Sequence, residues 1–137
     1  MFNTTSLARA ARSAAAIGLI ASGLFASSAF ASPGVSSSGS VLTDDRGMTL
    51  YRYTADQGGV SSCYGGCAAA WPPVLVDSVP SVADPGLAAA LGTASRTDGG
   101  QQLTYQGSPL YYYVGDSAPG QATGDGSDGV WFAIATN

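Results

Sequence analysis

The sequence has 137 residues, and its charged side chains are unusual in kind as well as in number. All nine acids are Asp, all five bases are Arg, and Lys, Glu and His are absent. Because His is the usual general base and metal ligand, and Schiff-base chemistry needs Lys, this composition argues against most hydrolase and metalloenzyme mechanisms. The net charge of −4 also argues against nucleic acid and anionic membranes as partners, since phosphate binding depends on clustered Lys and Arg.

Residues 1–31 have the pattern of a signal peptide. Two Arg residues give a positively charged start, residues 14–25 form a short apolar run, and Ala29 and Ala31 place small residues at a cleavage site. The run is too short to span a bilayer as a helix, and no Cys stands at the cleavage point to carry a lipid. We therefore predict cleavage after Ala31 and export to the periplasm or the extracellular space without a lipid anchor.

The chain after this segment is about the size of one small domain. It holds nine Asp against three Arg, which gives a net charge of about −6. Residues 32–40 are rich in Ser and Gly and are expected to be a flexible leader. Residues 41–137 are expected to be a single β-rich domain, because each half holds too few large apolar residues to stand alone.

The first half of this domain, about residues 41–76, predicts a β-hairpin. Residues 41–43 and 48–54 contain Leu, Thr and Tyr, which favour strands, and the Asp-Asp-Arg-Gly sequence of residues 44–47 favours a turn between them. A loop rich in Gly and Ser follows over residues 56–67.

A short helical turn is predicted at residues 68–71, where Pro72 and Pro73 end it. Farther along, Asp84 suits a helix N-cap, Pro85 suits the first helical position, and Gly92 suits the position just past the end. These three residues predict one short helix between the two halves of the domain.

The second half, about residues 93–135, predicts a second hairpin and a closing strand. The predicted strands are 93–97, 101–105, 109–114 and 130–135, and the predicted turns are 98–100 and 106–107. The predicted fold class is therefore mostly β: a small antiparallel domain built from two hairpin-containing repeats, with one short helix between them.

The two halves are copies of one another at an offset of 60 residues. Six identities occur at this offset: Gly47 and Gly107, Leu50 and Leu110, Tyr51 and Tyr111, Tyr53 and Tyr113, Asp56 and Asp116, and Trp71 and Trp131. A repeat of this kind usually marks a supersecondary unit that cannot close a core alone and packs against its copy.

Each repeat carries a Tyr-x-Tyr pair, namely Tyr51 with Tyr53 and Tyr111 with Tyr113. The period-2 spacing places both rings of a pair on one face of a strand. We expect these faces to pack against the two Trp residues and build the core. In the alternative interpretation, exposed rings form a platform for a sugar, a peptide or a planar cofactor.

Asp56 and Asp116 end the two Tyr-containing strands at equivalent places. We expect each to accept N–H bonds from the Gly-rich loop that follows it. Alternatively, the two carboxylates could meet near a pseudo-twofold axis, as glycoside hydrolysis requires. Residues 124–129 faintly resemble a calcium loop but lack its closing bidentate Glu, so a solvated turn is the preferred interpretation.

Cys63 and Cys67 are the one pair with redox or metal-binding potential. An exported protein with two Cys normally forms a disulfide, and closing so short a loop contributes only about 2 kcal/mol. The alternatives are a Cu(I) clasp of two thiolates, with Met48 as the only other soft ligand after residue 31, and a redox-active pair. No bound cofactor or metal is predicted.

The combined motifs resemble the bacterial "secreted repeat" family, often described as predicted lipoproteins. Its Tyr-x-(Phe/Trp/Tyr)-x-x-Asp signature occurs as Tyr51-Arg-Tyr53-Thr-Ala-Asp56 and as Tyr111-Tyr-Tyr113-Val-Gly-Asp116. The Cys-rich loop followed by Trp71-Pro72-Pro73, the stretch 96–111 and Gly129-Val-Trp131 are also similar to the family. The resemblance covers about residues 42–135.

The resemblance implies an exported, envelope-associated protein with no established activity, and it supplies no catalytic residues. The motif residues are expected to be structural. The chain departs from the lipoprotein pattern because it lacks an acylation Cys, which favours release over tethering. The predicted function is a non-enzymatic exported module that binds an unknown envelope component or protein partner. The alternative is a copper- or redox-linked periplasmic protein that uses Cys63 and Cys67.

Overall fold

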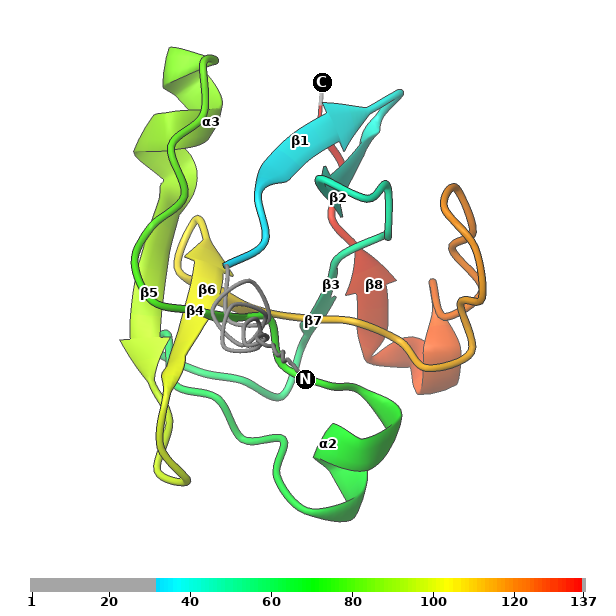
Figure 1. The fold of residues 1–137 in the computed structure, drawn as a ribbon. Coiled ribbons are helices and arrows are strands. Elements are labelled where there is room, and N and C mark those ends of the chain that lie inside the picture. Colours follow the sequence, from blue (N-terminus) through cyan, green and yellow to red (C-terminus); the bar gives the residue numbers. More distant parts are fainter. Residues whose placement is uncertain (1–31, 137) are drawn as a thin grey trace, which may run out of the picture. The chain divides into compact units, whose positions relative to one another are not determined.

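The computed structural model describes residues 32–136 of the chain (Figure 1). The predicted signal peptide, residues 1–31, lies outside the described residues. Within residues 32–136, no helix has both the length and the apolar character that crossing a membrane requires.

The chain begins with a hairpin of two short strands, β1 (Val35–Ser38) and β2 (Val41–Asp44). The two strands are antiparallel over their whole length, and Val35 is buried in the core. The prediction of a flexible leader over residues 32–40 is therefore wrong for the four residues of β1. Its three Ser residues suggested a flexible segment. They are exposed to solvent, but the backbone of the strand pairs with β2.

The strand β3 (Tyr51–Tyr53) follows β2 through the predicted Asp-Asp-Arg-Gly turn. The amide of Asp44 donates to the carbonyl of Met48 (2.9 Å), and Thr43 forms an antiparallel bridge with Thr49. The hairpin predicted over residues 41–54 is thereby confirmed, although the longer partner of β2 is β1.

The second repeat builds the same pattern from β5 (Leu91–Ser95), β6 (Gln101–Tyr105) and β7 (Ser108–Tyr111). The strands β5 and β6 are antiparallel, as β1 and β2 are. The predicted turn between β6 and β7 is confirmed at Gln106 and Gly107, whose φ angles of 50° and 83° are both positive. Such angles belong to the tight turns that hairpin strands favour.

Among residues 32–136, two short α-helices and one 3₁₀ turn connect the strands: α2 (Gly66–Ala70), α3 (Pro85–Ala90) and η2 (Ser127–Gly129). The Asp84 side chain accepts hydrogen bonds from the amides of Gly86 (2.9 Å) and Leu87 (3.4 Å), which confirms the predicted N-cap. The helix α3 ends at Ala90 with Leu91 as its C-cap, so Gly92 stands just past the end as predicted, although it already belongs to β5.

The two repeats exchange strands. In the main sheet, the order is β4 (Leu75–Val76), β6, β7, β3 and β8 (Trp131–Ala133), and β5 pairs with β6. Tyr51 lies directly opposite Tyr111 across β3 and β7, while Tyr53 lies opposite Trp131 across β3 and β8. On the other side of β7, Tyr111 bridges to Pro73. The strand β3 therefore lies between β7 and β8 of the other repeat, and Tyr111 at the end of β7 lies between Tyr51 and Pro73 of the other repeat.

The apolar core follows the same exchange. The amide of Val74 donates to the carbonyl of Leu110 (3.0 Å), and the amide of Ile134 donates to the carbonyl of Leu50 (3.2 Å). All four side chains are buried in one cluster. Because each pair joins the two repeats, neither repeat holds a core of its own.

This interleaved core predicts that equivalent substitutions in the two repeats weaken one common unfolding transition. We expect Leu50→Ala and Leu110→Ala each to lower the free energy of unfolding by about 2–5 kcal/mol, because both side chains are fully buried. Val79→Ala, at a site where the side chain is exposed, is the matched control. Urea unfolding followed by Trp fluorescence is the measurement. Two separate transitions in either Leu variant would contradict the interleaved core.

Candidate functional site

Four aromatic rings form a continuous pile, which we call the aromatic stack. Tyr53 lies on Trp131 with 4.1 Å between ring centroids, Trp131 lies on Trp71 at 4.0 Å, and Trp71 lies on Tyr113 at 4.2 Å. Each Trp thus contacts the Tyr of the other repeat. Both Trp rings are buried, and the two outer Tyr rings are partly buried.

The remaining two motif tyrosines, Tyr51 and Tyr111, meet the aromatic stack edge-on. Tyr51 lies 5.3 Å from Trp71 at an interplanar angle of 80°, and Tyr111 lies 5.1 Å from Trp131 at 89°. Stacked and edge-to-face pairs each contribute about 0.5–1.5 kcal/mol beyond the burial of their area. The predicted packing of the Tyr faces against the Trp residues is confirmed, so these rings form a second, aromatic core.

The hydroxyl groups of the edge-on tyrosines cross between the repeats. Tyr51 donates to Oδ2 of Asp116 (2.6 Å), and Tyr111 donates to Oδ2 of Asp56 (2.8 Å). We refer to these two bonds as the crossed Tyr–Asp pairs. Charge-assisted hydrogen bonds of this length are among the stronger ones in proteins.

The other oxygen of each carboxylate holds the loop that follows it. Oδ1 of Asp56 accepts from the amide (2.8 Å) and the hydroxyl (2.7 Å) of Ser62. Oδ1 of Asp116 accepts in the same way from the amide (2.9 Å) and hydroxyl (2.5 Å) of Thr123. The predicted role of both residues as acceptors for their loops is confirmed. Every carboxylate oxygen of the pair has a donor, and this arrangement is typical of structural carboxylates.

The phenol groups of the crossed pairs stay protonated over a wide pH range. Burial is the largest cause that raises the pKa of Tyr51, and its bond to Asp116 adds to the increase. Burial likewise raises the pKa of Tyr111 to about 12, and the bond to Asp56 contributes. Both hydroxyl groups are therefore neutral donors at physiological pH.

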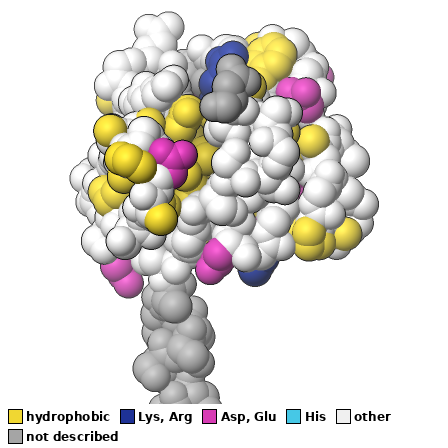
Figure 2. Space-filling view, turned by 90° about the horizontal axis from the view of Figure 1, so that it is seen from above, with side chains coloured by type: hydrophobic (Ala, Val, Ile, Leu, Met, Phe, Trp, Pro, Cys, Tyr) yellow, Lys and Arg dark blue, Asp and Glu magenta, His cyan; other side chains and the backbone are white. Residues whose placement is uncertain are grey.

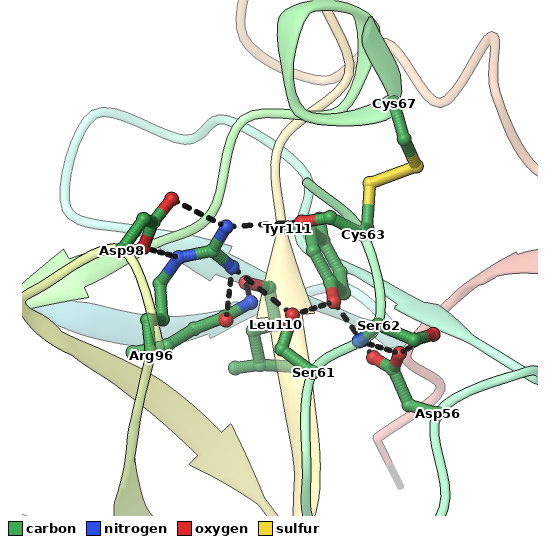
Figure 3. Close-up of a disulfide and its surroundings, with 10 residues drawn as sticks. Asp56, Ser61, Ser62, Cys63, Cys67, Arg96, Asp98, Leu110 and Tyr111 are labelled. Carbon is green, nitrogen blue, oxygen red and sulfur yellow. Dashed lines mark hydrogen bonds and ion pairs between the residues drawn. A yellow bond between two sulfur atoms is a disulfide. The ribbon is translucent and has the colours of Figure 1, made fainter. Parts of the chain in front are cut away.

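The second repeat contains a buried arginine, Arg96, that the sequence analysis did not single out. The Arg96 guanidinium donates to Gln102 Oε1 (2.8 Å), to Ser61 Oγ (3.0 Å) and to the carbonyl of Cys63 (2.9 Å) (Figure 3). Its Nε and Nη2 atoms donate to the two carboxylate oxygens of Asp98, at 2.9 Å and 3.2 Å. The only sequence signal was the scarcity of bases, and scarcity does not tell a buried Arg from an exposed one.

A directed chain of hydrogen bonds runs from Arg96 to the crossed pair of Tyr111 and Asp56 (Figure 3). Arg96 donates to the Ser61 hydroxyl, which lies 2.5 Å from the Tyr111 hydroxyl, and Tyr111 donates to Asp56. Because the Tyr111 proton points to Asp56, the Ser61 proton points to Tyr111. In the second repeat, the Gly124 amide donates to the Tyr51 hydroxyl (3.2 Å) and takes the place of Ser61.

The structure joins Cys63 and Cys67 through their sulfur atoms, with the Cα atoms 5.2 Å apart. Cys63 is fully buried against the aromatic stack, and Cys67 lies in α2. In the second repeat, Gly124 packs against Trp71, where a Cβ atom would lie 2.6 Å from the ring. The loop of the first repeat therefore contacts the aromatic stack through Cys63, whereas the loop of the second repeat contacts it through Gly124.

The remaining candidate metal site, residues 124–129, forms a turn. Oδ1 of Asp125 accepts from the Ala133 amide (3.0 Å), and Asp128 has a φ angle of 53° within η2. Across residues 32–136, no three His, Cys, Asp or Glu side chains gather as a metal-binding group. The preferred interpretation of this segment as a turn agrees with these contacts.

The crossed pairs predict an alkaline loss of stability. The folded state keeps Tyr111 protonated to about pH 12, whereas the unfolded chain releases that proton near pH 10, so stability falls as the pH rises through this window. We expect Tyr111→Phe to make the decline shallower and to cost about 1.5–3 kcal/mol at neutral pH, because Asp56 loses a buried donor. Urea midpoints from neutral pH to about pH 11.5 provide the test.

The matched control for this experiment is Tyr113→Phe. Tyr113 belongs to the aromatic stack that Tyr111 contacts edge-on. Its hydroxyl has no hydrogen-bond partner among residues 32–136. An equal loss of stability in the two variants, or a wild-type slope in Tyr111→Phe, would contradict the role given to the crossed pairs.

Comparison with known proteins agrees with the repeat architecture. Residues 34–75 and 92–135 both match a family described as "Secreted repeat of unknown function". The first matched segment includes β1, in keeping with the place of this strand in the fold. None of the curated proteins and none of the solved structures compared with the chain matches it. The matched segments cover more than half of the chain and confirm the resemblance, and the protein belongs to this family of secreted repeats.

Proposed function

We propose that the protein acts outside the cytoplasm as a rigid, non-catalytic module that binds an envelope component or another protein. Membership of a secreted family supports export. The composition supports the absence of common catalytic groups, since the chain has no His and no Lys. A periplasmic or extracellular location without a lipid anchor is part of the same proposal.

The observation that carries this proposal is the arrangement of the crossed Tyr–Asp pairs. A general acid or base needs a polar atom within reach of the substrate. In Asp56 and Asp116, both carboxylate oxygens accept hydrogen bonds from the protein itself. The two Asp residues of the motif thus hold the two repeats together. The binding of a partner is then expected to use surface residues outside the motif.

The surface offers small contact areas of mixed character. On the face seen in Figure 2, small groups of apolar side chains and a few charged ones, some of them beside each other, lie among mostly neutral atoms. Large apolar side chains with substantial exposure are Val60, Leu75, Val79 and Val114. A partner with a mixed, mostly neutral surface suits this chain better than a strongly charged polymer.

The proposal predicts no turnover that depends on the two motif carboxylates. We expect the purified protein to show no hydrolysis of a broad panel of glycosides, esters and peptides above background. Asp56→Asn and Asp116→Asn, with Asp77→Asn as a control outside the aromatic core, are the variants to compare. Measurable turnover that disappears in both motif variants while their near-UV circular dichroism stays unchanged would sink the proposal.

The state of the cysteine pair distinguishes this proposal from a copper- or redox-linked function. We expect protein purified from the export compartment to contain no titratable thiols and to be two hydrogens lighter than the reduced chain, because Cys63 and Cys67 are paired. Intact mass measured before and after reduction, followed by Cu(I) titration of the reduced protein, is the experiment. Two free thiols in the native protein, or stoichiometric Cu(I) uptake, would favour the alternative function.

A further inference from the structure

A hollow of about 390 Å³ lies on the side of β3 that faces away from the aromatic stack. Because Tyr51 and Tyr53 pack into the stack, the period-2 alternation of the strand directs Arg52 to the opposite side. The volume falls in the range of pockets that hold small ligands. The lining residues come from β3, from β8 and its continuation, and from the β6–β7 turn: Arg52, Tyr105, Gln106, Ser108, Ala133, Ile134 and Ala135.

The charge in this hollow is of one sign. Its lining includes one Arg and no Asp, although the chain has nine Asp residues. The described part of the chain holds three Arg residues, of which Arg46 pairs with Asp44 and Arg96 pairs with Asp98. Arg52 has no carboxylate partner among residues 32–136. A cation in a hollow without acids is complementary to an anionic group.

The Arg52 side chain is held in place by its neighbour on β8. Its guanidinium carbon lies 5.1 Å from the centroid of the Phe132 ring, directly across the strand pair. A guanidinium group stacked on an aromatic ring keeps its N–H groups free in its own plane. Those N–H groups match the two oxygens of a carboxylate.

The rest of the lining suits a small ligand with little charge. Ser108, Gln106 and Tyr105 supply neutral hydrogen-bonding groups, and Ala135 supplies a small apolar surface. Gln106 also borders a second hollow of about 530 Å³ between α3 and the β6–β7 turn, which is likewise lined without Asp. Gln106 is therefore a lining residue of both hollows.

We propose that the Arg52 hollow binds the carboxylate group of a small, otherwise uncharged ligand, and that the carboxyl-terminal end of a short peptide is the class that fits it best. The proposal deepens the binding function proposed above, because it names the ligand chemistry of such a module. In this proposal, Arg52 holds the carboxylate. Ser108 and Gln106 form hydrogen bonds with the polar atoms next to it, and Ala135 contacts the adjoining apolar part of the ligand.

The experiment is a titration of the whole secreted chain followed by two-dimensional NMR. The probes are N-acetyl-dialanine, its carboxamide, which removes the charge at nearly constant shape, and glucuronate, a carboxylate on a sugar. We expect N-acetyl-dialanine to shift the signals of the hollow, and the carboxamide to bind about tenfold more weakly or worse. The comparison with glucuronate tells a peptide source of the carboxylate from a sugar source.

Variants locate the binding. Arg52→Gln is expected to weaken carboxylate binding about tenfold or more, while Arg52→Lys, which keeps the charge but loses the paired N–H groups, is expected to lie in between. Arg46→Gln removes the same charge at an Arg outside the hollow and is the matched control. Ser108→Ala is a milder second variant whose effect does not depend on the net charge.

Equal binding of the acid and the carboxamide, unchanged affinity in Arg52→Gln, or shifts that avoid the hollow would overturn the carboxylate proposal. These outcomes leave the proposed function intact, since a module without turnover can bind a different ligand elsewhere. Conversely, turnover that depends on Asp56 and Asp116 would overturn the non-catalytic proposal, whatever binds at Arg52. The two failures are therefore distinguishable.

Discussion

The crossed Tyr–Asp pairs are the interaction on which the rest of the structure depends. Each pair ties a phenol of one repeat to a carboxylate of the other, at 2.6 Å and 2.8 Å. The second oxygen of the same carboxylate fixes the loop that leads to the next Trp, and that Trp stacks on a Tyr of the opposite repeat. A single short motif thus sets the strand pairing, the loop and the ring packing together, and it succeeds only when two copies are present.

The two copies are not equivalent outside this core. Around Tyr111 lie Ser61 and the cysteine pair of the first repeat, with Arg96 bonded to Ser61, whereas the second repeat brings the Gly124 amide to Tyr51. A fully buried guanidinium is costly unless its N–H groups are bonded. Arg96 meets this condition through Asp98, Gln102, Ser61 and a carbonyl oxygen. The asymmetry therefore lies in the loops and the network around them, while the ring stack and the apolar core keep the repeat symmetry.

This division of labour has a consequence for function. The residues that recur in the two repeats are the ones that close the fold, and the phenol and carboxylate groups of the crossed pairs are already bonded within the protein. Recognition chemistry is then expected at residues outside the repeat motif, where no identity between the copies is required. Arg52 is such a residue: it lies between two motif tyrosines, but its side chain belongs to the other face of the strand and to a hollow without acids.

Local sequence patterns were enough to predict the repeat, most strand and turn positions, the N-cap at Asp84 and the burial of the Tyr–Trp faces, because period-2 alternation and turn chemistry are local signals. Local patterns missed β1, since strand pairing can override a Ser-rich composition, and they began the strand after the helix at residue 93, whereas β5 begins at Leu91. The pairing of each Tyr with the Asp of the other repeat is seen in the folded structure alone. The same holds for the burial of Arg96 and for the absence of an ion pair at Arg52 within residues 32–136. These are contacts between residues far apart in the chain, and no local pattern specifies them.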